Sequence, residues 1–327
     1  MKKTLCLILS ILMILSLCAC GDTAAAPAAE KQTFKIGICQ LVKHDALDKA
    51  SQGFMDAIKD ELGDSVEFDY QLAAGDIPTC ATICNGFASD GVDLILANAT
   101  PALQAAAAAT DSIPVLGTAI TEYGVALDIN DFNGTVGGNI SGTSDLAPLD
   151  QQAQMIVDLI PGVQKVAILF CSSEANSVYQ AKVVTECLEK AGVQAESFTF
   201  SDSNDVTVVT TSACDSCDVL YIPTDNTAAS CAEAIGLIAD EKGIPVITGE
   251  EGPCAICGLA TLSIDYYDLG VTTGKMAVKI LKGEANISDM AIEYFPEPVK
   301  TFNPATLDAL NALGMNIVIP DDYIAIE

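Results

Sequence analysis

The sequence predicts an α/β fold made of two similar lobes, each a parallel β-sheet flanked by helices. Short apolar segments alternate with segments of helical periodicity, which is typical of parallel strands joined by helices. Three strand segments of the first half also recur in the same order in the second half, which indicates a duplicated lobe. Residues 34–327 are enough for two lobes of ordinary domain size.

The first half opens with a strand, a helix, a strand and a helix. Residues 35–42 form an apolar run typical of a strand covered on both faces. Residues 45–62 carry apolar side chains at helical spacing, and Gly63 supplies a stop signal. Residues 66–72 alternate as a strand does, and residues 77–88 have the pattern of a helix.

The repeated strand segments appear in both halves with similar spacing. The first copies are Lys35-Ile-Gly-Ile, residues 92–100 and Ile113-Pro-Val-Leu, and the second copies are Lys165-Val-Ala-Ile, residues 217–225 and Ile244-Pro-Val-Ile. We therefore expect each half to build one complete sheet with its covering helices.

The expected lobe boundaries follow from this repeat. The first lobe should comprise residues 34–140 plus 262–293, and the second residues 141–261 plus 294–327. The chain would cross between them near residues 138–144, 248–261 and 294–302, and hinges there would let the lobes close around a ligand.

The N-terminus has the layout of a secretory signal peptide. Lys2 and Lys3 precede an apolar run that is too short to span a membrane. Residues 17–20 resemble a bacterial lipobox in which Cys20 receives the lipid, since Ala19 and Gly21 beside it are small. We expect residues 1–19 to be the signal peptide and 20–33 the lipidated cysteine and a flexible linker. Ordinary cleavage with soluble secretion is the alternative.

The charge composition limits the possible partners. The chain carries a formal net charge of −29, which makes nucleic acid an unlikely ligand because phosphate binding needs clustered positive charge. All 15 basic residues are lysines. A ligand carboxylate would therefore be held by backbone N–H groups, hydroxyls, amides or lysine, and not by a guanidinium fork.

Ten cysteines follow residue 20, and they leave three interpretations open. Cys214-x-x-Cys217 and Cys254-x-x-Cys257 have zinc-knuckle spacing, but the two pairs are far apart for a compact zinc ribbon. Disulfides are a second interpretation in an exported chain. We favour the third, in which the cysteines serve as small apolar side chains, and we expect no metal and no cofactor.

Polar loops follow the predicted strands, where ligands bind in open α/β sheets. Thr100 precedes a proline that opens a helix, so free N–H groups there would suit a carboxylate. In the second lobe, residues 172–177 offer hydroxyls and an amide, and Asp225 is placed to accept hydrogen bonds from an ammonium group. The set suits an α-amino acid. The candidate ligand-binding residues are His44, Asn98, Thr100, Thr118, Ser144, Ser173, Asn176, Ser177, Asp225, Asn226, Glu250 and Asp265.

Each of the main candidates also has an ordinary structural interpretation. Thr100, Asn176 and Asp225 could be helix N-caps, and Asp265 could be either a cap or an interlobe contact. His44, the one histidine, could lie at the rim of the cleft or pack on a ligand ring.

Catalysis is not expected from this sequence. It contains no phosphate-binding glycine-rich loop, zincin helix or nucleophile elbow. A carboxylate pair in the cleft, Asp225 with Glu250 or Asp265, is the remaining route to an enzyme.

Several pieces of the chain, in order, resemble the tryptophan/tyrosine-type family of ABC transporter substrate-binding proteins. They are residues 40–48, 99–102, 142–148, 172–177, 223–226 and 265–270, within a match from about Lys35 to about Pro320. Where the family usually has Glu-His-Pro-Ala-Leu-Asp, this chain has Lys43-His44-Asp45-Ala46-Leu47-Asp48, which puts the solute's identity in doubt more than the fold.

The resemblance implies the two-lobed type I periplasmic-binding-protein fold. It also implies a monomeric, membrane-anchored protein outside the cell, which captures a small solute, an amino acid and possibly an aromatic one, for an ABC permease and its ATPase. The same fold could instead present its solute to a membrane kinase or chemoreceptor.

Overall fold

The computed structural model describes residues 33–295 and 298–326. The predicted signal peptide, the lipobox with Cys20 and nearly all of the predicted linker lie outside the described residues. Among the residues that the structure describes, no helix combines the length and the apolar character needed to cross a membrane.

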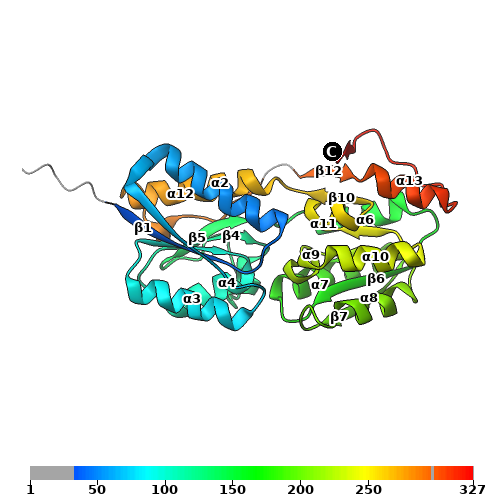
Figure 1. Ribbon diagram of the computed structural model, residues 1–327, viewed down its shortest axis with the longest axis horizontal. Helices are drawn as coiled ribbons and strands as arrows, with labels where there is room; N and C mark the ends of the chain where they lie inside the picture. The colour runs from blue at the N-terminus through cyan, green and yellow to red at the C-terminus, as the bar shows by residue number, and fades with distance from the viewer. Residues whose placement is uncertain (1–32, 296–297, 327) are drawn as a thin grey trace, which may run out of the picture. The chain divides into compact units, whose positions relative to one another are not determined.

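The first lobe is built on a six-stranded sheet in the order β11-β5-β4-β3-β1-β2, and all of its strands are parallel. Helices α2 and α12 cover one face, and α3 and α4 cover the other (Figure 1). The strands are β1 Phe34–Gln40, β2 Val66–Leu72, β3 Leu94–Asn98, β4 Val115–Ile120, β5 Ile140–Ser144 and β11 Glu293–Tyr294. The helices are α2 Asp45–Leu62, α3 Ile77–Asp90, α4 Thr100–Ala109, α5 Tyr123–Ala126 and α12 Tyr266–Leu281, with short 3-10 turns at Gly63–Ser65 and Ile287–Asp289.

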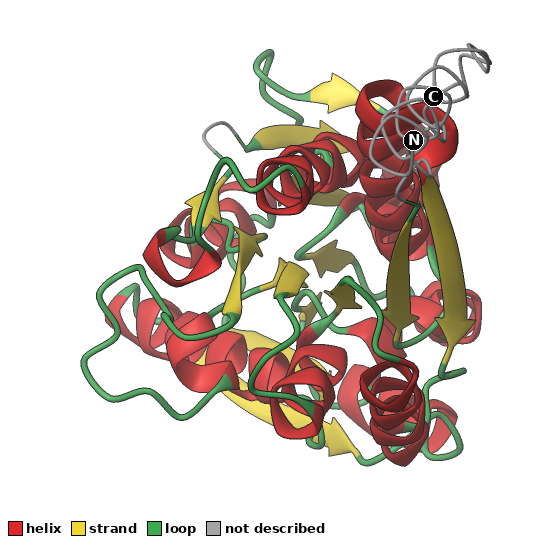
Figure 2. Ribbon diagram, turned by 90° about the vertical axis from the view of Figure 1, so that its left-hand side faces the viewer, coloured by secondary structure: helices red, strands yellow, loops and turns green. Residues whose placement is uncertain are grey.

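The second lobe is built on a seven-stranded sheet in the order β13-β12-β10-β9-β8-β6-β7, in which only the β10–β12 pair is antiparallel. Helices lie on both faces of this sheet, since two separate apolar clusters pack on it. Figure 2, viewed from the left-hand side of Figure 1, shows helices in red and strands in yellow. The strands are β6 Lys165–Cys171, β7 Gln194–Phe200, β8 Val219–Ile222, β9 Val246–Thr248, β10 Ala260–Ser263, β12 Val299–Phe302 and β13 Ile324–Ala325. The helices are α6 Leu149–Leu159, α7 Ala175–Lys190, α8 Val206–Cys214, α9 Asn226–Ser230, α10 Ala232–Lys242, α11 Glu251–Cys257 and α13 Pro304–Ala312.

The predicted repeat is visible in individual hydrogen bonds. The strand order β2-β1-β3-β4-β5 of the first sheet is matched by β7-β6-β8-β9-β10 in the second. In the first lobe the backbone N–H of Lys35 donates to the Asp93 carboxylate, and in the second the N–H of Lys165 donates to the Asp218 carboxylate. The predicted two-lobed α/β fold is confirmed.

The chain passes from one sheet to the other three times, a few residues from the expected points. The crossings follow Ser144, Ser263 and Tyr294, which end β5, β10 and β11. The first sheet therefore reaches to Ser144, beyond the expected boundary at residue 140, and the second sheet keeps residues 262–263. The difference arises because the strands continue to pair up to the crossing, and pairing is not visible in a single strand's sequence.

Helices α2 and α12 touch through their backbones. A Cβ atom on Gly270 would lie 2.0 Å from the carbonyl oxygen of Ala50, and one on Gly53 would lie 2.1 Å from the carbonyl oxygen of Tyr267. Only glycine fits at both positions. This close approach lets Phe54 and Ile58 of α2 share a buried cluster with Met276 of α12.

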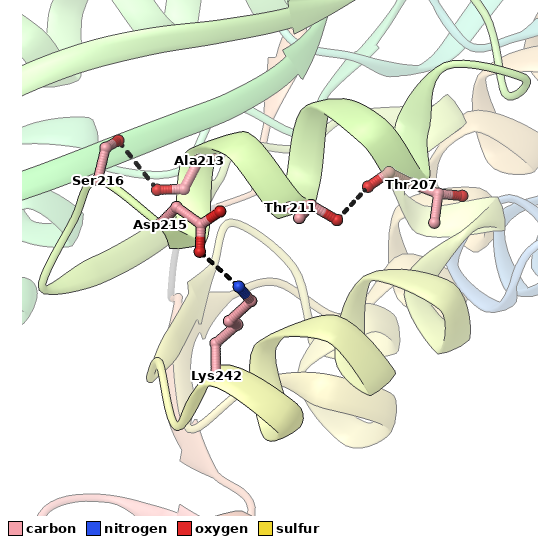
Figure 3. Close-up of polar contacts among 6 residues, drawn as sticks. All are labelled: Thr207, Thr211, Ala213, Asp215, Ser216 and Lys242. Carbon is pink, nitrogen blue, oxygen red and sulfur yellow. Dashed lines mark hydrogen bonds and ion pairs between the residues drawn. The ribbon is translucent and has the colours of Figure 1, made fainter.

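The Cys214-x-x-Cys217 spacing is the end of a helix and a turn. Asp215, between the two cysteines, pairs with Lys242 of α10, and the Ser216 hydroxyl donates to the carbonyl of Ala213 (Figure 3). All ten cysteines in the described residues are free thiols, and this part of the chain has no group of three or more His, Cys, Asp or Glu side chains suited to a metal ion.

Candidate functional site

Residues from the carboxyl ends of strands in both lobes meet around His44. This residue precedes α2, and its Nε2 lies 3.2 Å from Oδ1 of Asn226 in the second lobe. A groove of about 90 Å³ beside them is lined from both lobes, with Val42 and Gly75 on one side and Ser173 and Thr227 on the other. The sequence predicts a ligand site between the lobes, and residues of both lobes come together at this position.

Four carboxylic side chains are buried in this region without a cation. Asp145, Glu174, Asp225 and Glu250 are each at most 4% exposed, and among the described residues no lysine is buried. Taking carboxylates out of water is costly unless they gain opposite charges or hydrogen bonds. A carboxyl group whose oxygens already accept hydrogen bonds from the protein has a structural role, whereas one whose oxygens lack donors is available to a ligand.

Glu174 is fully engaged within the second lobe. Its Oε2 accepts from the backbone N–H and the side-chain amide of Asn226, and its Oε1 accepts from the backbone N–H and the hydroxyl of Thr227. These bonds fix the start of α9 to the loop before α7. Glu174 was not among the sequence candidates.

Asp225 is also engaged within the second lobe. Its Oδ1 accepts from the N–H of Ala228 as the N-cap of α9, and its Oδ2 accepts from the N–H of Cys171, each at 2.7 Å. Burial and the neighbouring Glu174 raise its pKa to about 7. The capping interpretation therefore describes Asp225 well, and both oxygens that the sequence assigned to an ammonium group already have donors.

Glu250 is the opposite case. It occupies the N-cap position of α11 without a cap hydrogen bond, it is 1% exposed, and neither carboxyl oxygen has a partner. Burial, followed by the charges of Asp145 and Asp225, raises its pKa well above the ordinary value.

Asp145 lies in the crossing between β5 and α6 and is partly satisfied. Its Oδ2 accepts a hydrogen bond of 3.0 Å from the Tyr266 hydroxyl, and its Oδ1 has no partner. Burial raises its pKa to about 6. Tyr266 also interacts with Thr224 of the second lobe, so its ring lies among Asp145, Glu250 and Thr224.

Three predicted residues hold the interior of the first lobe and its crossing. The side-chain amide of Asn98 donates to the Leu47 carbonyl and the Ser51 hydroxyl, so it ties β3 to α2. Thr118 accepts from the hydroxyls of two other buried threonines, and Ser144 donates to the Thr121 carbonyl. Of these three, only Asn98 keeps a buried acceptor, its Oδ1, without a partner.

The remaining predicted residues divide between the site and the surface. Asn176 and Ser177 are buried beside Asp225, and Asn176 Oδ1 has no partner. Ser173 is exposed and donates to the Ser201 carbonyl. Asp265 is exposed and caps α12 through the N–H of Asp268.

Thr100 is the first residue of α4 and is not its cap. The N-cap position belongs to Ala99, which has a φ of 91° and makes no side-chain cap bond. The start of α4 therefore has no side-chain acceptor, as the carboxylate hypothesis requires, and Thr100 does not make the cap that was its alternative interpretation.

Sequence reasoning missed Asp145, Glu174 and Tyr266. All three lie inside segments that carry the family resemblance, in residues 142–148, 172–177 and 265–270. For Asp145 and Tyr266 that resemblance was the available signal, because a crossing segment and the first turn of a helix are not strand-end loops. Glu174 lies in the strand-end loop of residues 172–177, where only the hydroxyls and the amide were considered.

A family model described as "ABC transporter substrate binding protein" matches residues 35–318. The chain belongs to this family. Its members work outside the cytoplasm and bind small solutes. The tyrosine-binding protein of Clostridioides difficile (strain R20291) is 35% identical to this substrate-binding protein, over 95% of this chain and 92% of the relative. These relatives bind solutes and are not enzymes, which confirms the prediction that this protein is not an enzyme.

Solved structures agree with the assignment. An ABC domain from Streptococcus pneumonia in complex with L-Trp is 33% identical, with a TM-score of 0.82 over 88% of this chain and 96% of that one. A ligand-free, open substrate-binding protein from Clostridium difficile is 37% identical, with a TM-score of 0.66 over 90% of this chain and 99% of that one. The substrate-binding protein described here is thus more similar in structure to the L-Trp complex, although it is more similar in sequence to the open protein.

Proposed function

We propose that this protein captures an α-amino acid between its two lobes and delivers it to an ABC permease and its ATPase. The observation that carries the proposal is the group of buried interlobe carboxyls without a cation, which a ligand's ammonium would neutralise. The relatives that bind tyrosine or L-Trp support an aromatic amino acid. The hinges lie at the three crossings, and closure of the lobes encloses the solute.

The solute's carboxylate fits the N-terminus of α4 on the first lobe. Helix α4 has ten residues, its N-terminus carries no side-chain cap, and its first residue, Thr100, is buried near the end of β3. Backbone N–H groups and the helix dipole favour an anion there. This matters because the chain has no arginine to supply a bidentate partner.

Calorimetric titration of the purified protein with the twenty amino acids tests the ligand class. We expect saturable one-to-one binding of L-tyrosine or L-tryptophan and much weaker binding of the acidic amino acids, whose extra carboxylate would face the buried acids. Failure of every amino acid to bind would contradict the proposal.

Transport can be separated from sensing in cells. Deletion of this protein should abolish high-affinity uptake of the radiolabelled amino acid, and the wild-type gene should restore it. Unchanged uptake together with a changed chemotactic or kinase response would favour a receptor role.

We propose further that the protein is a monomer anchored to the outer face of the membrane through a lipid on Cys20. Cys20→Ala should move the protein from the membrane fraction to the medium or leave it as uncleaved precursor. Mature Cys20→Ala protein that still needs detergent for extraction would contradict the anchor. Light scattering of the soluble form should give the mass of one chain.

A further inference from the structure

Three carboxylate oxygens in the interlobe region are buried and have no hydrogen-bond partner. They are Oε1 and Oε2 of Glu250 and Oδ1 of Asp145. The two side chains are close enough for each charge to affect the other, and Tyr266 interacts with both. Buried acceptors of this kind are rare in folded proteins, and each one without a partner costs about 1–3 kcal/mol or more when charged.

Apart from the Thr121 hydroxyl, which interacts with Asp145, the surrounding protein does not supply the missing donors. Glu174 and Asp225, the other two buried acids, accept from the backbone and side chains of their own lobe. No lysine in the described residues is buried. Protonating Glu250 would remove its charge, but its buried oxygens would still lack hydrogen-bond partners.

We propose that Glu250 and Asp145 together bind the ammonium group of the solute, with Tyr266 as the positioning residue for Asp145. A primary ammonium has three N–H donors and a positive charge, which matches three unpartnered oxygens on two acids. The inference rests on the proposed function, because it takes this interlobe region as the solute site. It differs from the sequence expectation, which assigned the ammonium to Asp225.

This assignment makes the amine the main recognition element of the ligand. Two acidic side chains face the ammonium, whereas the solute's carboxylate meets neutral groups and no arginine. The protein should therefore accept primary amines that lack the carboxylate more readily than acids that lack the amine. The substrate class becomes primary amines with an aromatic or similar side chain, of which α-amino acids are one part.

Calorimetry with L-tyrosine, tyramine and 3-(4-hydroxyphenyl)propionate tests this class on the wild-type protein and on Glu250→Gln and Asp145→Asn. Tyramine should bind more tightly than the propionate to the wild-type protein. Each substitution removes a charge-assisted bond and should weaken L-tyrosine and tyramine about ten- to a hundredfold. Binding of the propionate should stay constant or improve, because a negative charge has been removed.

Glu189→Gln is the matched control, since it makes the same change on an exposed position of α7 and should alter nothing. Thermal unfolding without ligand separates recognition from structure. Glu250→Gln should melt at the same or a higher temperature, because it removes a buried charge that has no partner. A purely structural Glu250 would instead give a lower melting temperature.

The outcomes distinguish the two proposals. If L-tyrosine binds and both substitutions leave its affinity unchanged, the ammonium site is wrong and the amino-acid function stands. If the wild-type protein binds the propionate but neither amine, the ammonium site is also wrong. If none of the three ligands binds and the wider amino-acid panel also fails, both proposals are overturned.

Discussion

His44 and Asn226 join the two lobes through a hydrogen bond between Nε2 and Oδ1, with 3.2 Å between the two atoms. The His44 side chain is half-buried, and desolvation lowers its pKa. Because Oδ1 of Asn226 is an acceptor, Nε2 of His44 is the donor of this bond.

Loss of this contact should favour separation of the lobes. His44→Ala should weaken solute binding by about three- to tenfold, as expected for one neutral hydrogen bond of about 0.5–1.5 kcal/mol. Small-angle scattering without ligand should show a larger radius of gyration than the wild-type protein has. His44→Gln keeps an amide donor, so its affinity and its radius of gyration should lie between those of His44→Ala and those of the wild-type protein. Unchanged affinity and unchanged scattering for His44→Ala would show that the contact does not influence closure.

Asp225→Asn should act mainly on stability. Asp225 accepts from Ala228 and Cys171, so an amide in its place can keep only one of these acceptors and sets a donor against the other N–H. We expect a loss of about 1–3 kcal/mol in the free energy of unfolding, measured by urea denaturation. The preference for tyramine over the propionate should persist. If Asp225→Asn lost the preference for tyramine while its free energy of unfolding stayed unchanged, Asp225 would be the residue that binds the ammonium.

The ligand-free protein should lose stability as pH rises. Burial raises the pKa of Asp145 from 3.8 to about 6 and that of Asp225 to about 7, and it raises the pKa of Glu250 well above its ordinary value. Between the unfolded and folded pKa values the folded protein holds protons that the unfolded chain has released. The free energy of unfolding therefore falls through this window, on the order of 1.4 kcal/mol for each pKa unit.

Thermal unfolding between pH 4 and pH 8 measures this effect. Glu250 faces Asp145, Asp225, Glu174, Asp45 and the Tyr266 hydroxyl, so the titrations are linked and the decline should be broad. Glu250→Gln should make the decline shallower. Affinity for tyramine should rise over the same window, because the ammonium binds the ionised acids and releases their protons. A ligand-free protein whose stability increases from pH 4 to pH 8 would contradict this account.

Gly270→Ala tests the contact between α2 and α12. The new methyl group would meet the Ala50 carbonyl oxygen at 2.0 Å, and a backbone atom inside a helix cannot move aside cheaply. We expect a loss of about 1–3 kcal/mol and a lower melting temperature. Gly86→Ala in α3 is the matched control, because nothing lies within 4 Å of its added Cβ atom, and it should be neutral or slightly stabilising. Equal melting temperatures for the two variants would show that the helices can separate at no cost.

Buried Cys214 and half-buried Cys217 should behave as unreactive thiols in the folded protein. Burial raises the pKa of Cys214 to about 11 and that of Cys217 to about 12, so neither forms the thiolate that zinc and alkylating reagents require at neutral pH. Iodoacetamide at pH 8 should leave both unmodified in the folded protein and modify both in urea. Elemental analysis should find far less than one zinc per chain. Stoichiometric zinc, lost together with folding in Cys214→Ser, would overturn this interpretation.

The regular elements were predictable because their signals are local. The helix at residues 45–62 and the strand at residues 66–72 have the bounds that periodicity and Gly63 indicate. The site was predictable only in part. The sequence shows that a carboxylate, Asp225, follows β8. It does not show that this carboxylate accepts a hydrogen bond from the N–H of Cys171, which belongs to another strand, β6. Asp145 escaped notice because its burial depends on Tyr266, which lies more than a hundred residues later in the chain.

The first lobe is made of segments that the second lobe interrupts, and this sets the order in which the protein can fold. Residues 34–144 are synthesised before any of the second lobe, but α12 and β11 follow it. Until they arrive, Phe54 and Ile58 of α2 lack the surface that later covers them. Until synthesis is complete, the N-terminal half therefore lacks the helix that covers one apolar face of its sheet. A chain truncated after β10 would contain the five core strands of the second lobe's repeat but no complete first lobe.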